Sequence, residues 1–365
     1  MKNIAKDISV AIQNAGTYVA VFEGKAYKIN PTFYHLIQEM KKNRSLDEIL
    51  ADIGNSQKLS HSDIALIKEH YICFLNKIDN NKVDEKGKYI KFKRTLLNQK
   101  SIKKTCSCMV CLFRKKIFLL MTIIAAIING LFFFHTLSVE SYSQLSLIPF
   151  IISTVLFLFI MLLHEFGHSS ACLSLGVPVK DIGFGIYFIF PVLYSDVTEI
   201  ALLQKRQRLI VDSAGIYFQL LVNAILAFLC FLMKEGSVYN LLLCIWTLNG
   251  ISLSYALIPF FRNDGYWMYS DYFAIDNLME QCKKWYSKSL WQKNLPIALF
   301  GCSDFLFKIY VSCKLCIYTF GNITDIINAE DVMDYLKSGC FLIICFYGIF
   351  LMVRSFTSKI SHESL

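Results

Sequence analysis

The sequence contains few charged residues. Only 18% of its 365 residues are Asp, Glu, Lys or Arg, whereas a soluble domain carries about 25%. Hydrophobic residues make up 55% of the chain and fall in long blocks. One soluble core could not bury that much apolar surface. The composition therefore excludes an ordinary soluble protein and predicts helices that lie in lipid.

Other common features are also missing. The first 80 residues contain no apolar run of the kind that forms a secretory signal peptide. The thirteen cysteines are an odd number, and several lie inside apolar blocks, so a disulfide framework is not expected. The sequence shows no internal repeat and no ATP-binding loop, which argues against a peptide exporter.

Positive charge is concentrated in one segment. The net charge is +9, and residues 82–116 contain twelve Lys or Arg but only two acids, Asp84 and Glu85. Such a run can bind nucleic acid. Here an apolar block follows directly, and basic segments beside a membrane span usually lie on the cytoplasmic face against anionic lipid. We therefore predict a basic juxtamembrane linker at 81–116 and no nucleic-acid partner.

The first 80 residues alternate between strand and helix periodicity. They predict a small α+β domain at 1–80, winged-helix-like and cytoplasmic. The predicted elements are strands at 18–22 and 26–29, a helix from Pro31, a second helix with the capping-box pair Ser45 and Glu48, and a third helix at about 62–75.

Six apolar blocks follow the linker, each long enough to cross roughly 30 Å of hydrocarbon. Together they predict an all-α polytopic membrane domain at 117–355, followed by a short cytoplasmic tail at 356–365. The blocks are 117–135, 147–174, 208–232, 239–260, 296–319 and 338–355.

The connections between these blocks predict the orientation. With the amino terminus inside, the inner connections and the C-terminal end hold eleven Lys or Arg, and the outer loops hold only Lys234 and Lys337. Basic residues are enriched in cytoplasmic loops. We therefore expect a multi-pass protein of a bacterial cell membrane, with both termini in the cytoplasm.

Residues 176–200 differ from the spans around them. Glycines, prolines and a run of aromatic residues interrupt this segment too often for a spanning helix. Irregular backbone at membrane depth is tolerated where it is buried in protein or lines a wet cavity. We predict a strand-rich, re-entrant segment beside the functional site.

His164, Glu165 and His168 form an HExxH motif in the second predicted span. Two histidines four residues apart share one helical face, so both can bind one zinc ion, and the glutamate can act as a base. A histidine on a membrane helix can also be a packed, hydrogen-bonded residue. Three ionisable residues within five positions of an apolar helix nevertheless favour a functional site.

Zinc needs a third protein ligand, and two acids compete for this role. Asp264 follows the fourth predicted span, and Gly265 after it allows a close backbone approach. An interfacial turn is the other interpretation of the Asn-Asp-Gly sequence. Asp196, in the broken segment, is the rival ligand or a hydrogen-bond partner of a zinc-binding histidine.

The motif and the later acid together resemble the site-2 protease family of intramembrane zinc metalloproteases. In that family, HExxH on one span is followed by Asp-Gly on a later span, and the Asp is the third zinc ligand. The resemblance implies that His164, His168 and Asp264 bind Zn²⁺ and that Glu165 is catalytic.

The sequence also departs from that family. In that family Asn-Pro usually precedes the Asp, but here Arg262 and Asn263 precede Asp264, so the proline is missing. A Gly-Pro-x-x-Asn element on the intervening span is matched only loosely. The resemblance implies that Gln219 and Asn223, in this stretch, support the site or contact substrate.

The amino-terminal region is similar to the peptide-binding fold of PqqD and related recognition domains of ribosomal-peptide biosynthesis. The similarity lies in Tyr-Lys-Ile-Asn-Pro at 27–31 and Arg-Ser-Leu-Asp-Glu-Ile at 44–49. Such domains bind a leader peptide as an extra strand at a sheet edge. The resemblance therefore implies a leader peptide as partner. A winged-helix-like domain without a ligand is the alternative.

Two further features remain outside the expected site. Cys106, Cys108 and Cys111 are close enough in sequence to bind metal, but a fourth partner is lacking, so we interpret them as juxtamembrane or acylated cysteines. Asp212, near the start of the third predicted span, is interpreted as a helix cap or as a charge that reaches the membrane surface.

The expected activity is hydrolysis of a peptide bond in or beside the membrane, with Glu165 transferring the proton. The expected substrate is a ribosomally made peptide that is matured during export. One alternative is a regulatory protease that cuts a membrane-anchored anti-sigma factor or a signal-peptide remnant. A second alternative is a non-proteolytic membrane protein for peptide export or immunity, which would not need Glu165.

The distribution of basic residues makes the orientation testable. Reporter fusions at Ser141 and Asn328 should report an outside location, and fusions at Lys284 and Leu365 an inside location, because the positive-inside asymmetry is eleven to two. Paired phosphatase and fluorescent-protein reporters would measure this. An inside signal at either predicted outer loop would contradict the six-span topology.

Overall fold

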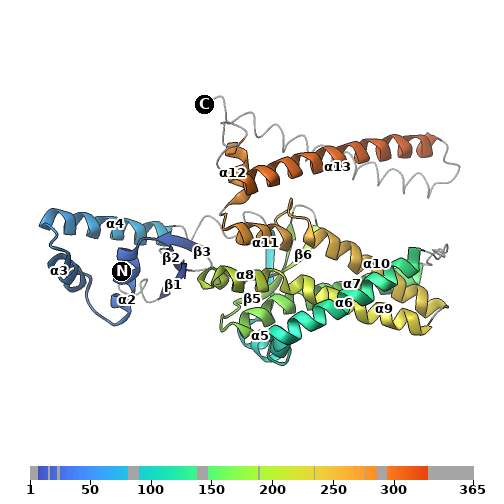
Figure 1. The fold of residues 1–365 in the computed structure, drawn as a ribbon, viewed down its shortest axis with the longest axis horizontal. Helices are drawn as coiled ribbons and strands as arrows, with labels where there is room; N and C mark the ends of the chain where they lie inside the picture. Colours follow the sequence, from blue (N-terminus) through green and yellow to red (C-terminus); the bar gives the residue numbers. More distant parts are fainter. Residues whose placement is uncertain are drawn as a thin grey trace. The chain divides into compact units, whose positions relative to one another are not determined.

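The computed structural model describes residues 7–14, 17–22, 25–80, 90–137, 147–187, 190–233, 235–275, 277–285 and 294–327 (Figure 1). Most of these residues are helical. The chain divides into two compact units, Met1–Tyr272 and Phe273–Leu365.

The first unit begins with a three-stranded antiparallel sheet in the order β1-β2-β3. Strands β2 and β3 confirm the two predicted strands, whereas β1 was not predicted, because its polar end obscures a short alternation. The strands are β1 (Ser9–Asn14), β2 (Thr17–Phe22) and β3 (Lys25–Ile29).

Three helices follow the sheet, as predicted. The Asn30 side chain caps the first of them by accepting a hydrogen bond from the Phe33 N–H at 2.7 Å. The predicted capping box is present: Ser45 Oγ accepts from the Glu48 N–H at 3.3 Å, and Glu48 Oε2 accepts from the Ser45 N–H at 3.2 Å. The helices are α2 (Pro31–Lys41), α3 (Leu46–Gln57) and α4 (His61–Asn80).

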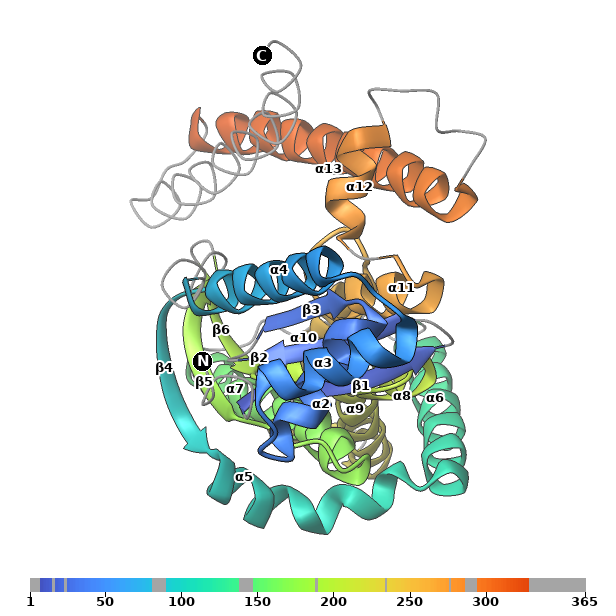
Figure 2. The ribbon, with the colours of Figure 1, turned by 90° about the vertical axis from the view of Figure 1, so that its left-hand side faces the viewer.

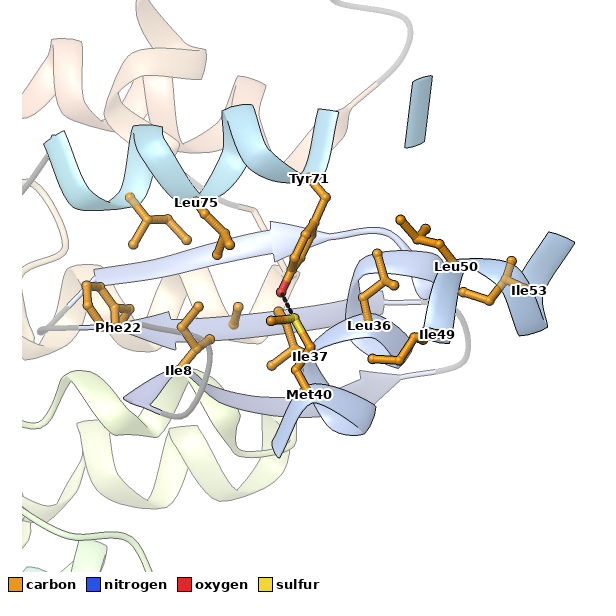
Figure 3. Packing of buried hydrophobic residues seen from close by; sticks show 12 residues of the cluster. Ile8, Phe22, Leu36, Ile37, Met40, Ile49, Leu50, Ile53, Tyr71 and Leu75 are labelled. Atoms are coloured by element: carbon orange, nitrogen blue, oxygen red, sulfur yellow. Dashed lines mark hydrogen bonds between the residues drawn. The ribbon is translucent and has the colours of Figure 1, made fainter. Parts of the chain in front are cut away.

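Figure 3 shows the core of this region, in which the helices pack on one face of the sheet. Ala20 and Phe22 of β2 point into that core. Val19 and Val21 alternate with them and are also buried, at 3% and 1% exposure, so they face the other side of the sheet. That side lies against the short helix η2 (Thr198–Leu202). The contact includes a hydrogen bond from the Gln13 side chain to the Ala201 carbonyl.

A second antiparallel sheet has the order β4-β5-β6 (Figure 2). Two of its strands confirm that residues 176–200 are rich in strand. The third strand, β4, comes from the basic segment, which also contains α5 and η1 and therefore has more regular structure than a linker. The elements are β4 (Ile90–Asn98), α5 (Gln99–Cys106), η1 (Ser107–Phe113), β5 (Asp181–Tyr187) and β6 (Phe190–Ser195).

Five described segments are helical, long and apolar enough to cross a membrane, and they coincide with the first five predicted spans. The sixth predicted span, 338–355, lies outside the described residues. The corresponding helices are α6 (Lys115–Leu137), α7 (Leu147–Ser174), α8 (Lys205–Asp212) with α9 (Ala214–Met233), α10 (Ser237–Leu257) and α13 (Leu295–Ile327).

The third of these segments is interrupted at Ser213, between α8 and α9. Asp212 is the last residue of α8 and is only 6% exposed. The interpretation of Asp212 as a charge that reaches the membrane surface is therefore wrong. Helix α8 packs against α7, where the Val211 carbonyl lies 2.8 Å from His168 Nδ1.

Helix α9 is the most buried of the five segments and packs against α6, α7 and α10. Asn129 of α6 links three of these helices. It donates to the Leu220 carbonyl of α9 at 3.1 Å and accepts from the Trp246 indole N–H of α10 at 3.0 Å. Large apolar side chains on the outer faces of α6, α7, α9 and α10 are exposed, as expected of helices that face lipid.

The second unit contains α12 (Leu278–Trp285) and α13. Leu278 and Cys282 of α12 are buried, as are Ala298 and Phe300 of α13. An ion pair also lies on α13, where Lys308 Nζ is 2.6 Å from Asp304 Oδ2, one turn earlier.

Candidate metal centre

Helix α7 brings the two motif histidines together near its C-terminal end. His164 and His168 are one turn apart, and their Nε2 atoms lie 3.1 Å from each other. Their side chains are 14% and 10% exposed. Two imidazole nitrogens therefore converge on one point inside an apolar helix bundle.

Asp264 completes the group from a separate element. It is the first residue of α11 (Asp264–Phe273), which follows the turn after α10. Its Oδ2 lies 3.2 Å from His164 Nε2, and its Oδ1 lies 3.4 Å from His168 Nε2. The structure thus unites the three residues that the sequence predicts as ligands.

The turn before α11 explains how Asp264 reaches this position. Asn263 Nδ2 donates to the Tyr255 carbonyl at 2.6 Å, and Asn263 Oδ1 accepts from the Tyr266 N–H at 3.3 Å. Gly265 packs so closely that a Cβ there would lie 2.4 Å from the Leu257 carbonyl oxygen. The turn and ligand interpretations of Asn-Asp-Gly are therefore compatible, because the turn aims Asp264 at the histidines.

The three side chains fit a tetrahedral metal ion. Their distances of 3.1, 3.2 and 3.4 Å are close to the ligand separation of about 3.3 Å that zinc bonds of about 2.0 Å require. Asp264 Oδ2 is buried and makes no hydrogen bond with any described group, despite its nearness to His164. Such an oxygen needs a cation or another partner.

The charge state of Asp264 also suits a ligand. Burial alone would raise the pKa of its carboxyl, but His168 and His164 outweigh burial and hold the pKa below its usual range. Asp264 is therefore an anion at neutral pH. A carboxylate must be deprotonated to bind a metal.

The second nitrogen of each imidazole has a hydrogen-bond acceptor. His164 Nδ1 lies 3.0 Å from Gln219 Oε1 of α9, and His168 Nδ1 lies 2.8 Å from the Val211 carbonyl of α8. When each Nδ1 carries the proton, the neutral ring leaves the Nε2 lone pair for the shared point. Histidines that bind metals almost always have such partners.

A buried amide network fixes the orientation of Gln219. Its Nε2 donates to Asn249 Oδ1 at 2.9 Å and to Ser252 Oγ at 3.1 Å, both on α10. Asn249 Nδ2 in turn donates to the Gln219 carbonyl at 3.0 Å and to Asn223 Oδ1 at 2.8 Å. With Nε2 committed in this way, Oε1 of Gln219 must face His164. Gln219 thus orients His164 directly, and Asn223 does so through Asn249.

Glycine 215 of α9 leaves room for the metal group. A Cβ at Gly215 would lie 2.4 Å from His164 Cε1, 2.5 Å from His164 Nε2 and 2.5 Å from His168 Nε2. A side chain would therefore fill the space toward which both imidazoles point. This close approach requires glycine.

Glu165 lies beside the group and is held by the second sheet. Ser195, the last residue of β6, donates from Oγ to Glu165 Oε2 at 2.5 Å and lies 3.2 Å from the Glu165 carbonyl. Glu165 is 8% exposed. Strand β6 thus ends at Ser195, which binds the residue that the sequence predicts as the base.

Asp196 is placed differently from Asp264. Its Oδ1 accepts from the Thr198 hydroxyl at 2.6 Å and from the Thr198 N–H at 3.2 Å. Among the described residues, the group that could hold a metal contains His164, His168 and Asp264, without Asp196. The Asp196 carboxylate therefore stabilises the turn after β6.

Several supporting residues were not predicted from the sequence. Asn249 and Ser252 could have been found, because polar side chains in an apolar span need partners. Ser195 and the Val211 carbonyl give no such signal. Their roles depend on β6 and α8 meeting α7.

The space beside Gly215 makes a direct prediction. Gly215→Ala should lower the zinc content of the purified protein to near zero, since two imidazoles cannot move away from the new methyl group and still share one metal. Gly130→Ala is the matched control, because a Cβ at Gly130 meets nothing within 4 Å. Metal analysis by mass spectrometry would measure both. Equal zinc in the two variants would contradict this geometry.

The chain is similar to protein YydH of Bacillus subtilis (strain 168), which is provisionally named a peptide zinc metalloprotease. The two are 26% identical over 128 residues, or 34% of this chain. The match covers 49% of YydH, so the chain spans about half the length of this curated relative. No family model matches the chain, and no solved structure matches it either.

Proposed function

We propose that the chain is a membrane-embedded zinc metalloendopeptidase of the site-2 protease type. The observation that carries the proposal is the convergence of His164, His168 and Asp264 at tetrahedral distances, with Glu165 next to the first histidine. The name of the Bacillus relative supports a metallopeptidase, although the two proteins match over only part of their lengths.

The proposed mechanism assigns a role to each side chain. The three ligands would hold zinc, which when bound acidifies water and polarises a carbonyl group. Glu165 accepts a proton from the attacking water at its carboxylate and returns it to the leaving amine. Ser195, through its 2.5 Å hydrogen bond, keeps the Glu165 carboxylate in one orientation. The apolar bundle restricts the entry of bulk water.

The sheet beside the site offers a place for an extended substrate. Among the described strands, β6 pairs only with β5, so its other edge can accept a strand. The strand runs toward Ser195 and therefore toward Glu165. A peptide added to this edge would pass the catalytic base in the extended form that proteolysis requires.

We further propose that the substrate is a ribosomally made peptide and that the amino-terminal domain binds its leader. The support is the α+β architecture of this domain, whose three-stranded sheet has two edge strands, β1 and β3. The proposed location is a bacterial cell membrane with both termini in the cytoplasm. Co-expression with candidate precursor peptides, comparing wild type with Glu165→Gln by mass spectrometry, tests this assignment.

Metal content tests the central claim. Wild type should bind about one zinc per chain, and the double variant His164→Ala, His168→Ala should bind none. Glu165→Gln should retain zinc and lose cleavage, because the base is not a ligand. Equal zinc in wild type and the double variant would refute the assignment.

The two aspartates give a second test. Asp264→Ala should abolish cleavage and lower zinc affinity by more than the roughly 10–100-fold typical of residues that only support a ligand. Asp196→Ala should retain measurable activity and zinc, because Asp196 pairs with Thr198. Chelator competition measures the affinity. The reverse order of effects would show that Asp264 only shapes the turn.

A further inference from the structure

Helix α8 contacts two of the elements that carry metal ligands. Its Val211 carbonyl accepts the hydrogen bond from His168 of α7. On the other side, Arg208 Nε donates to Asp271 Oδ2 of α11 at 2.7 Å. The Arg208 and Asp271 side chains are 12% and 20% exposed, so water screens this ion pair only weakly.

The spacing along α11 connects this ion pair to the metal group. Asp271 follows Asp264 by seven residues, which is about two helical turns, so both carboxylates lie on the same face of α11. Arg208 binds the far end of that face. Because α11 is a short helix of 10 residues, fixing Asp271 also fixes the direction in which Asp264 points.

The Arg208 side chain is itself held in place by a second hydrogen bond. The Arg208 Nη1 atom donates to the Leu203 carbonyl at 3.2 Å, which ties the guanidinium to the segment before α8. The same side chain therefore connects two segments, and its planar fork suits this double contact. A lysine could retain the charge but not both hydrogen bonds.

Asp212 adds a further buried carboxyl group near the Arg208–Asp271 ion pair. It lies four residues after Arg208, is 6% exposed, and its Oδ2 has no hydrogen-bond partner among the described groups. Its carboxylate interacts electrostatically with Asp271 and Asp264. Three carboxylates thus gather at the α8–α11 contact. Without Arg208, Asp271 would lose the cation with which it pairs at this contact.

We propose that Arg208 and Asp271 form a positioning pair that seats α11 on α8, so that Asp264 meets the two imidazoles of α7. This inference rests on the proposed zinc site. Neither residue touches the metal group. Both act through the placement of Asp264, and loss of either side chain weakens metal binding before any substrate is involved.

Zinc affinity in a Glu165→Gln parent tests the proposal without a substrate. Arg208→Gln and Asp271→Asn should each lower the affinity about 10–100-fold, as is typical for residues that support a ligand. The double variant should lose no more zinc affinity than the single variant with the larger loss, because the two side chains act as one unit. Arg208→Lys should lose less than Arg208→Gln. Chelator competition and the absorption spectrum of the Co²⁺ form measure affinity and ligand geometry.

Arg206→Gln is the matched control. Arg206 is exposed on the same helix, and the substitution removes the same charge. Parent-like affinity in this control, together with losses at Arg208 and Asp271, supports the pair. Parent-like affinity in both single variants, additive losses, or an equal loss in Arg208→Lys and Arg208→Gln would overturn it. A parent without zinc would instead refute the proposed function itself.

Discussion

The structure depends on the requirement that polar groups inside an apolar helix bundle must find partners there. His164 and His168 are costly at this depth unless both nitrogens of each ring are satisfied. One nitrogen of each ring donates to Gln219 or to Val211, and the other faces Asp264. Gln219 of α9 and Asn249 of α10 meet the same requirement, because their amide groups are hydrogen-bonded to each other.

Close helix packing makes this convergence possible. A Cβ at Gly167 would lie 2.5 Å from the Ala214 carbonyl, and Gly215 faces both imidazoles directly. Small residues allow membrane helices to approach in this way. Helix α8, which precedes α9, contacts both His168 and α11. The centre is therefore assembled from four helices and a turn.

The second sheet connects the basic segment to Glu165. β4 belongs to the basic segment that precedes the first span, yet it pairs with β5, whose neighbour β6 ends at Ser195 beside Glu165. The amino-terminal sheet packs on η2 and buries Val19 and Val21. Helix η2 itself follows β6 along the chain.

Local sequence patterns determined the helices, their caps and the histidine pair, because a capping box or two residues one turn apart depend only on nearby chain. Asp264 was identified through the family resemblance, and the tertiary structure brings it to the histidines. Only the folded chain showed that Ser195 holds Glu165, that Arg208 pairs with Asp271 and that Asp212 is buried. These contacts join residues 30 or more positions apart or depend on an interrupted helix. Periodicity reports which face of a helix is apolar, but it does not report which helices meet.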